Sequence, residues 1–72
     1  MNNEKNIKIG DNVILVDHEF FFGYDPDQEY KVIKIYQVPC MLGYNTTWFE
    51  VEYEEDNKVY NENFPLFAVE KA

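Results

Sequence analysis

Residues 47–57 read TWFEVEYEEDN, and apolar and acidic side chains alternate through most of this stretch. Successive side chains of a strand point to opposite faces. The apolar side chains therefore share one face of the expected strand: Phe49, Val51 and Tyr53. The acidic side chains share the other face: Glu50, Glu52 and Glu54. Trp48 has the parity of the glutamates, so the pattern predicts a β domain with one strongly acidic sheet face that also carries a tryptophan.

The length and composition predict one small domain with an aromatic core. The chain has 72 residues, and we expect a flexible tail over residues 1–6 and a single domain over residues 7–72. Cys40 is the only cysteine, which excludes an intramolecular disulfide and a cysteine-based zinc site. Six tyrosines, six phenylalanines and one tryptophan offer large buried areas instead.

Four further strands are predicted from apolar runs that are bounded by turn residues. The expected ranges are residues 13–16, 30–38, 58–61 and 67–70. Asp56 and Asn57 predict a tight turn between the third and fourth strands, because both residues tolerate a left-handed backbone. Pro65 suits the first turn of a short helical segment over residues 63–66, before the last strand.

The order of these elements resembles the Src-homology-3-like small barrel, in the broad sense that includes Tudor and KOW-type domains. The segments that carry the resemblance are residues 9–13, 30–36, 48–54 and 63–69. The resemblance implies an all-β fold, a small five-stranded antiparallel barrel with a short helical turn before the last strand. It also implies a long loop after the first strand, which flanks the ligand groove of that family.

The charge of the chain points away from nucleic acid and towards a basic protein. Fourteen acidic and six basic side chains give a formal net charge of −8. Direct binding of phosphates requires the opposite balance, so we expect a basic protein partner and no direct contact with nucleic acid. No apolar run is long enough to span a membrane, and the first residues lack the apolar core of a signal peptide. We expect no membrane association and a cytoplasmic location.

The sequence offers no catalytic, cofactor or metal site. His18 and Cys40 are the only residues for a cysteine–histidine pair, and a chain of this size leaves little room for a deep pocket around them. Asp25, Asp27 and Glu29 alternate as in calcium loops, but the required glycine and the terminal glutamate spacing are missing. We therefore expect that the protein is not an enzyme and needs no cofactor.

The first functional hypothesis uses the acidic face itself. Side chains two apart on a strand repeat every ~6.6–6.8 Å, close to the ~6.8 Å of two phosphate steps along a DNA strand. Carboxylates at that spacing can compete with nucleic acid for a basic cleft, as a phage or mobile-element inhibitor of a host or defence protein would. The predicted partner-binding residues are Trp48, Glu50, Glu52, Glu54, Glu55 and Asp56. A plainly solvated face is the competing interpretation, with Lys58 paired to Glu54 or Glu55.

The second hypothesis is a peptide-recognition module, and it rests on the resemblance. Aromatic and acidic side chains of the long first loop, with Trp48, would bind a proline-rich or cationic peptide. The residues implied are Phe21, Tyr24, Asp25, Asp27, Glu29 and Trp48. A Tudor-like variant would read a methylated side chain through cation–π contacts with aromatic walls: Tyr36, Trp48, Tyr53 and Tyr60. Because Tyr53 and Trp48 differ in parity, these four rings are not expected to line one cage.

Overall fold

The computed structural model describes residues 6–16 and 27–72, which form five strands and one short 3₁₀ helix. The strands are β1 (Asn12–Leu15), β2 (Glu29–Pro39), β3 (Asn45–Glu55), β4 (Lys58–Pro65) and β5 (Val69–Lys71), and the 3₁₀ helix η1 is Leu66–Ala68. All pairings are antiparallel, and the strand order is β4-β3-β2-β1-β5. The predicted class, five antiparallel strands with a helical turn before the last, is confirmed.

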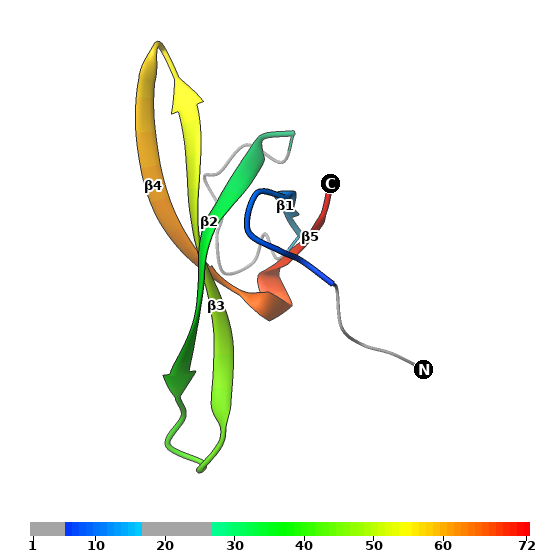
Figure 1. The fold of residues 1–72 in the computed structure, drawn as a ribbon, viewed down its shortest axis with the longest axis vertical. Coiled ribbons are helices and arrows are strands. Elements are labelled where there is room, and N and C mark those ends of the chain that lie inside the picture. The colour runs from blue at the N-terminus through cyan, green and yellow to red at the C-terminus, as the bar shows by residue number, and fades with distance from the viewer. Residues whose placement is uncertain (1–5, 17–26) are drawn as a thin grey trace.

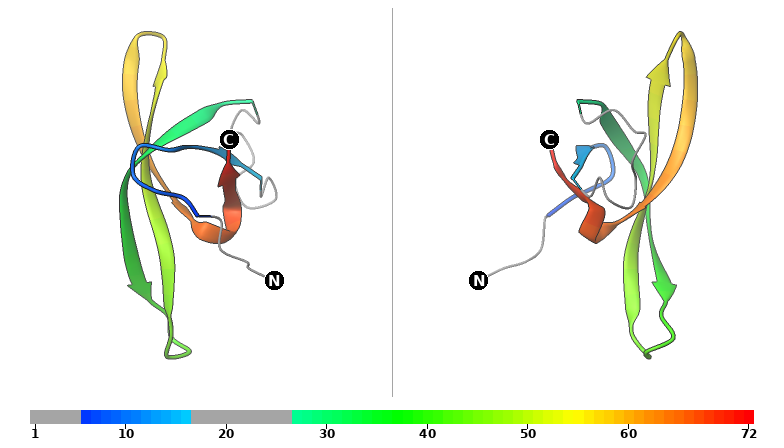
Figure 2. Two further views of the ribbon diagram at one scale, coloured as in Figure 1. Left: turned by 45° about the vertical axis from the view of Figure 1, so that its right-hand side comes forward. Right: turned by 180° about the vertical axis from the view of Figure 1, so that it is seen from behind.

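Three long strands build one twisted layer, and the short elements lie to one side of it (Figure 1). β2, β3 and β4 run along the longest dimension of the molecule, which measures 41 × 25 × 24 Å. β1, η1 and β5 pack beside the middle of this layer, as the two further views confirm (Figure 2). The β2–β3 hairpin and the β3–β4 hairpin project in opposite directions.

The sheet stays open, so the closure expected of a barrel is not made. β4 and β5 are its two edges and are not hydrogen-bonded to each other. β1 pairs with only three residues of β2, Glu29 to Lys31, and β5 is three residues long. These short strands are sufficient to cover the middle of the long layer, but not to complete a cylinder around it.

A register shift between Val32 and Lys34 divides β2 into two parts. Before the shift, Tyr30 and Val32 are buried. Tyr30 lies opposite Val13 of β1, and the Val32 carbonyl oxygen accepts a hydrogen bond from the Gly10 N–H. After the shift, β2 leaves the core, and Ile35 is partly exposed. The nearly continuous apolar pattern of this strand predicts either two-sided burial or a strong bend, and the irregularity in register fits the bend.

The core lies between the long layer and the short strands, and it is apolar throughout. Its buried members are Val13, Leu15, Tyr30, Val32, Phe49, Val51, Phe64, Ala68 and Val69. Ile7, Tyr53 and Leu66 pack against it. Phe49 and Val51 are thus buried as their parity predicts, and Tyr53 lies at the margin of the same cluster.

The C-terminal boundaries differ from the sequence-based ones. β4 continues to Pro65, so the helical turn begins at Leu66 and the last strand begins at Val69. The cause is Phe64, which lies opposite Phe49 and is completely buried. Packing of this ring keeps the chain extended past the point where Pro65 suggested a helical start, and Pro65 serves as the cap residue before η1.

Candidate partner-binding face

The glutamates of β3 share one face of the sheet, which we call the outer face because the core lies on the other. Glu50 and Glu52 are half-buried there, and Glu54 is exposed. On β4 their opposite residues are uncharged: Asn63, Asn61 and Val59. The Asn61 side-chain amide donates a hydrogen bond of 3.2 Å to Glu50 Oε2. Three carboxylates therefore follow one another along a single strand, with neutral side chains on one flank.

Two lysines flank the same glutamates on the β2 side. Lys34 lies opposite Glu50, and Lys31 lies opposite Glu52. Among the described residues, none of these pairs reaches ion-pair distance, and the ion pair that forms elsewhere joins Lys71 to Asp11. Cross-strand charge pairs at exposed positions contribute less than about 1 kcal/mol. The lysines thus moderate the acidic potential near β2, and among the described residues no cation lies opposite Glu54.

An aromatic row crosses the outer face next to the glutamates. Tyr36 lies opposite Trp48, and Trp48 lies opposite Pro65. The indole Nε1–H donates to Thr46 Oγ1 at 3.2 Å, and the Tyr36 hydroxyl donates to Asn63 Oδ1 at 2.8 Å. Each ring is held at one polar atom, so the row is a fixed surface of apolar and aromatic character beside Glu50.

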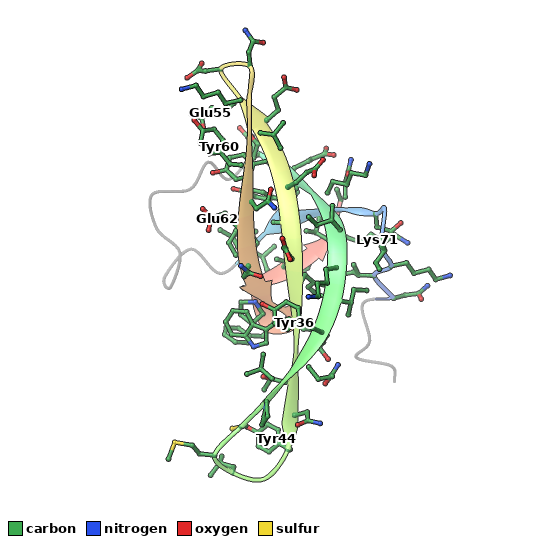
Figure 3. All side chains as sticks on the ribbon, turned by 60° about the vertical axis from the view of Figure 1, so that its left-hand side comes forward. Tyr36, Tyr44, Glu55, Tyr60, Glu62 and Lys71 are labelled. Carbon is green, nitrogen blue, oxygen red and sulfur yellow. The ribbon has the colours of Figure 1, made fainter. Side chains whose placement is uncertain are left out.

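The opposite face of the β3–β4 hairpin is acidic and aromatic as well. Tyr53 lies opposite Tyr60, and their rings stack at a centroid distance of 5.5 Å. Burial, together with the nearby carboxylates of Glu62 and Glu55, raises the pKa of Tyr53. Glu55, Tyr60 and Glu62 lie together along this hairpin, whereas Tyr44 is at the far end of the molecule (Figure 3). Glu55 is therefore not on the face of Glu50, Glu52 and Glu54.

The acidic feature is thus a hairpin with two acidic faces, and not one face of a flat sheet. We call the hairpin formed by residues 50–63 the acidic hairpin. Asp56 occupies its turn with a positive φ of 54°. Its acidic residues are Glu50, Glu52, Glu54, Glu55, Asp56 and Glu62, and Lys58 is its single basic residue. Glu62 was not among the predicted residues, although its parity with Tyr60 and Phe64, which places the three on one face of β4, was the available signal.

The residues of the peptide-binding hypothesis are only partly described. Phe21, Tyr24 and Asp25 lie outside the described residues. Glu29 begins β2 and accepts a hydrogen bond of 3.1 Å from Asn12 Nδ2, and Asp27 is exposed just before it. Trp48 lies opposite Tyr36, seven positions further along β2 than Glu29, which is about 23 Å of extended strand.

The aromatic residues of the Tudor-like variant divide between two faces. Tyr36 and Trp48 belong to the outer face, whereas Tyr53 and Tyr60 stack on the other. This division is the one that parity predicts, so the four rings do not line one cage. The nearest cation to an aromatic face of the first pair is Lys34, whose Nζ lies 5.8 Å from the Tyr36 ring centroid.

Residues 6–16 and 27–72 contain neither a candidate metal cluster nor a membrane-spanning helix. No group of three or more His, Cys, Asp or Glu side chains in these ranges is arranged to hold a metal ion. The single helical element there is three residues long, and no helix reaches the length and hydrophobicity that crossing a membrane requires.

Comparison of the chain with known proteins gave no match to a family model, to a curated protein sequence or to a solved structure.

Proposed function

We propose that the protein is a non-enzymatic binding domain whose acidic hairpin occupies a basic, nucleic-acid-binding surface of a partner protein. The observation that carries this proposal is the concentration of charge: six carboxylates and one lysine lie on a hairpin that projects from the body. Alternate glutamates on β3 repeat at the ~6.6–6.8 Å expected of a strand, which approximates two phosphate steps. A phage or mobile-element inhibitor of a host or defence protein is one concrete form of this function.

Electrostatics would govern both the rate and the salt dependence of such a complex. A projecting charge of one sign accelerates encounter with a surface of opposite sign, and exposed charges are screened over ~8 Å at physiological salt. Affinity should therefore fall steeply as salt rises. The partner should also release the protein when duplex DNA is added, because the two ligands would compete for one surface.

The test compares two charge-reversed variants of equal net charge. E50K/E52K/E54K alters the acidic hairpin, and D27K/E29K/E70K makes the same change of charge away from it. Proteins captured from the native host by the immobilised wild-type chain are identified, purified and titrated against both variants over a range of salt. We expect the hairpin variant to lose measurable binding and the control variant to retain most of it. Equal affinities of the two variants would exclude the acidic hairpin as the binding surface.

The aromatic row supports a second candidate function, recognition of a proline-rich or cationic peptide. Trp48 is half-buried between Tyr36 and Pro65, with its indole N–H fixed on Thr46. Under this hypothesis Trp48→Ala abolishes binding and salt has a small effect, whereas E50K/E52K/E54K is tolerated. The control variant D27K/E29K/E70K would then lose affinity, because Asp27 and Glu29 belong to the implied peptide site.

A further inference from the structure

The β2–β3 hairpin ends in a two-stranded arm, which we define as residues 37–47. Among the described residues, its strands pair only with each other, because β4 ends at Pro65 opposite Trp48 and the pairing of β1 with β2 does not extend beyond Lys31. The arm extends beyond the body of the molecule (Figure 1). A two-stranded hairpin without a covering layer is marginally stable on its own. A partner that covers such an arm therefore stabilises it.

The tip of the arm exposes three large side chains. Met41 is fully exposed, Leu42 is 79% exposed and Tyr44 is 56% exposed. The loop beneath them is closed by two backbone hydrogen bonds, Cys40 N–H to Tyr44 O at 2.7 Å and Gly43 N–H to Cys40 O at 3.0 Å. Gly43 adopts a φ of 92°, which this closure requires and which suits glycine. The side chains are thus displayed from a loop with a defined shape.

The arm is also free of charge. Every Asp, Glu, Lys and Arg of the chain lies outside residues 37–47, so the net charge of −8 resides entirely in the rest of the molecule. Contiguous exposed apolar groups mark interaction sites. The charge distribution selects among possible occupants, because a second copy and an anionic lipid surface would both be repelled by the strongly negative body.

We propose that the arm tip is an anchor that inserts Met41, Leu42 and Tyr44 into an apolar pocket of a partner protein. Methionine adapts to irregular pockets, and tyrosine buries a large ring while its hydroxyl stays at a polar rim. The Cys40 thiol beside that hydroxyl raises the pKa of Tyr44, which favours the neutral phenol at such a rim. This surface lies at the opposite end of β3 from the acidic hairpin, and the proposal does not depend on the function of that hairpin.

The experiment places a photoreactive benzoyl-phenylalanine at position 42 of the full chain, with a matched probe at position 57 in the other hairpin tip. The probes are irradiated in the native host, and the adducts are mapped by mass spectrometry. We expect the position 42 probe to label apolar residues of one protein. That protein is then purified and titrated with wild type, M41D/L42D and the milder M41S/L42S. Both variants should bind at least about 100-fold more weakly, because the apolar surface that Met41 and Leu42 bury in the pocket is lost. Their salt dependence should equal that of wild type.

Several results would overturn the anchor. One is an affinity of both variants within threefold of wild type, and another is the formation of adducts of the chain with itself. A third is binding of the wild-type chain to vesicles of phosphatidylcholine with ~20% phosphatidylserine, an anionic surface of ordinary density. Thermal melting establishes that the variants are folded, and the serine variant decides the case if the aspartate variant is not. The two proposals fail separately: wild-type affinity of M41D/L42D and M41S/L42S removes the anchor and leaves the proposed function, whereas wild-type affinity of E50K/E52K/E54K removes the proposed function and leaves the anchor.

Discussion

At the scale of single residues, three aromatic rings from three strands hold the core together. Tyr30 of β2 meets Tyr53 of β3 and Phe64 of β4, each at a centroid distance of 5.1 Å and in an edge-to-face arrangement. Such pairs contribute about 0.5–1.5 kcal/mol beyond the area that they bury. In a chain with one cysteine, these contacts supply the stability that disulfides provide in other small domains.

Replacement of Phe64 by alanine is expected to lower the free energy of unfolding by about 3–5 kcal/mol, because a fully buried ring leaves a cavity. Urea denaturation followed by tryptophan fluorescence measures this loss. The matched control is Phe67→Ala, since Phe67 is 61% exposed and its truncation should cost about 0.5 kcal/mol or less. Similar losses from the two substitutions would mean that the edge-to-face cluster is not the centre of the core.

At the scale of elements, the turn at residues 56–57 fixes the register of the acidic hairpin. Asp56 and Asn57 have φ values of 54° and 65°, and Glu55 lies opposite Lys58. Positive φ at both central residues is the geometry of a two-residue turn that matches the twist of its strands. The same register stacks Tyr53 on Tyr60 and sets Glu54 opposite Val59.

Substitution of Asn57 should change stability according to the cost of positive φ. Asn57→Gly is expected to raise the free energy of unfolding by about 0.5 kcal/mol, because glycine adopts this conformation without a steric penalty. Asn57→Val is expected to lower it by about 1–2 kcal/mol. Thermal and urea denaturation of the three proteins should rank them glycine, asparagine, valine. A valine variant as stable as wild type would contradict the left-handed turn.

At the scale of the whole molecule, the two ends of the described chain are joined through Asp11. Its Oδ2 accepts the Lys8 backbone N–H at 2.9 Å and lies 3.5 Å from Lys71 Nζ on β5. The Ala72 N–H donates to Asn12 O at 2.9 Å in the same region. The hydrogen bond from Lys8, assisted by the charge of Lys71, lowers the pKa of Asp11 below its ordinary value of 3.8.

A lowered carboxyl pKa stabilises the fold at pH values above 3.8, and the contribution disappears as the pH falls through the lower folded-state value. Asp11→Asn should therefore be less stable than wild type at pH 7, and the difference should shrink in acid. Unfolding by urea at pH 7 and near pH 2.5, about one unit below the pKa of an ordinary aspartate, measures this difference in stability. Lys71→Ala isolates the ion pair, whose effect salt should weaken. A difference that is independent of pH would show that Asp11 acts through packing alone.

The sequence by itself determined what depends on neighbouring residues. Alternation in residues 47–57 specified the β class, the burial of Phe49 and Val51, and the parity of Trp48, because side-chain direction in a strand has a period of two. The turn at Asp56 and Asn57 followed from their tolerance of positive φ. The aromatic composition anticipated the buried rings of Tyr30, Phe49 and Phe64, which share the core with six aliphatic residues.

Only the tertiary structure decided which strands pair, in what register, and where pairing stops. Lys31 lies opposite Glu52, and the register shift after Val32 sets Lys34 opposite Glu50. The end of β4 at Pro65 leaves the arm uncovered. The continuation of β4 brings Glu62 to the face of Glu55, so the acidic residues surround a hairpin. These features arise from contacts between residues distant in the chain, such as Phe64 with Tyr30, and a local pattern carries no information about such contacts.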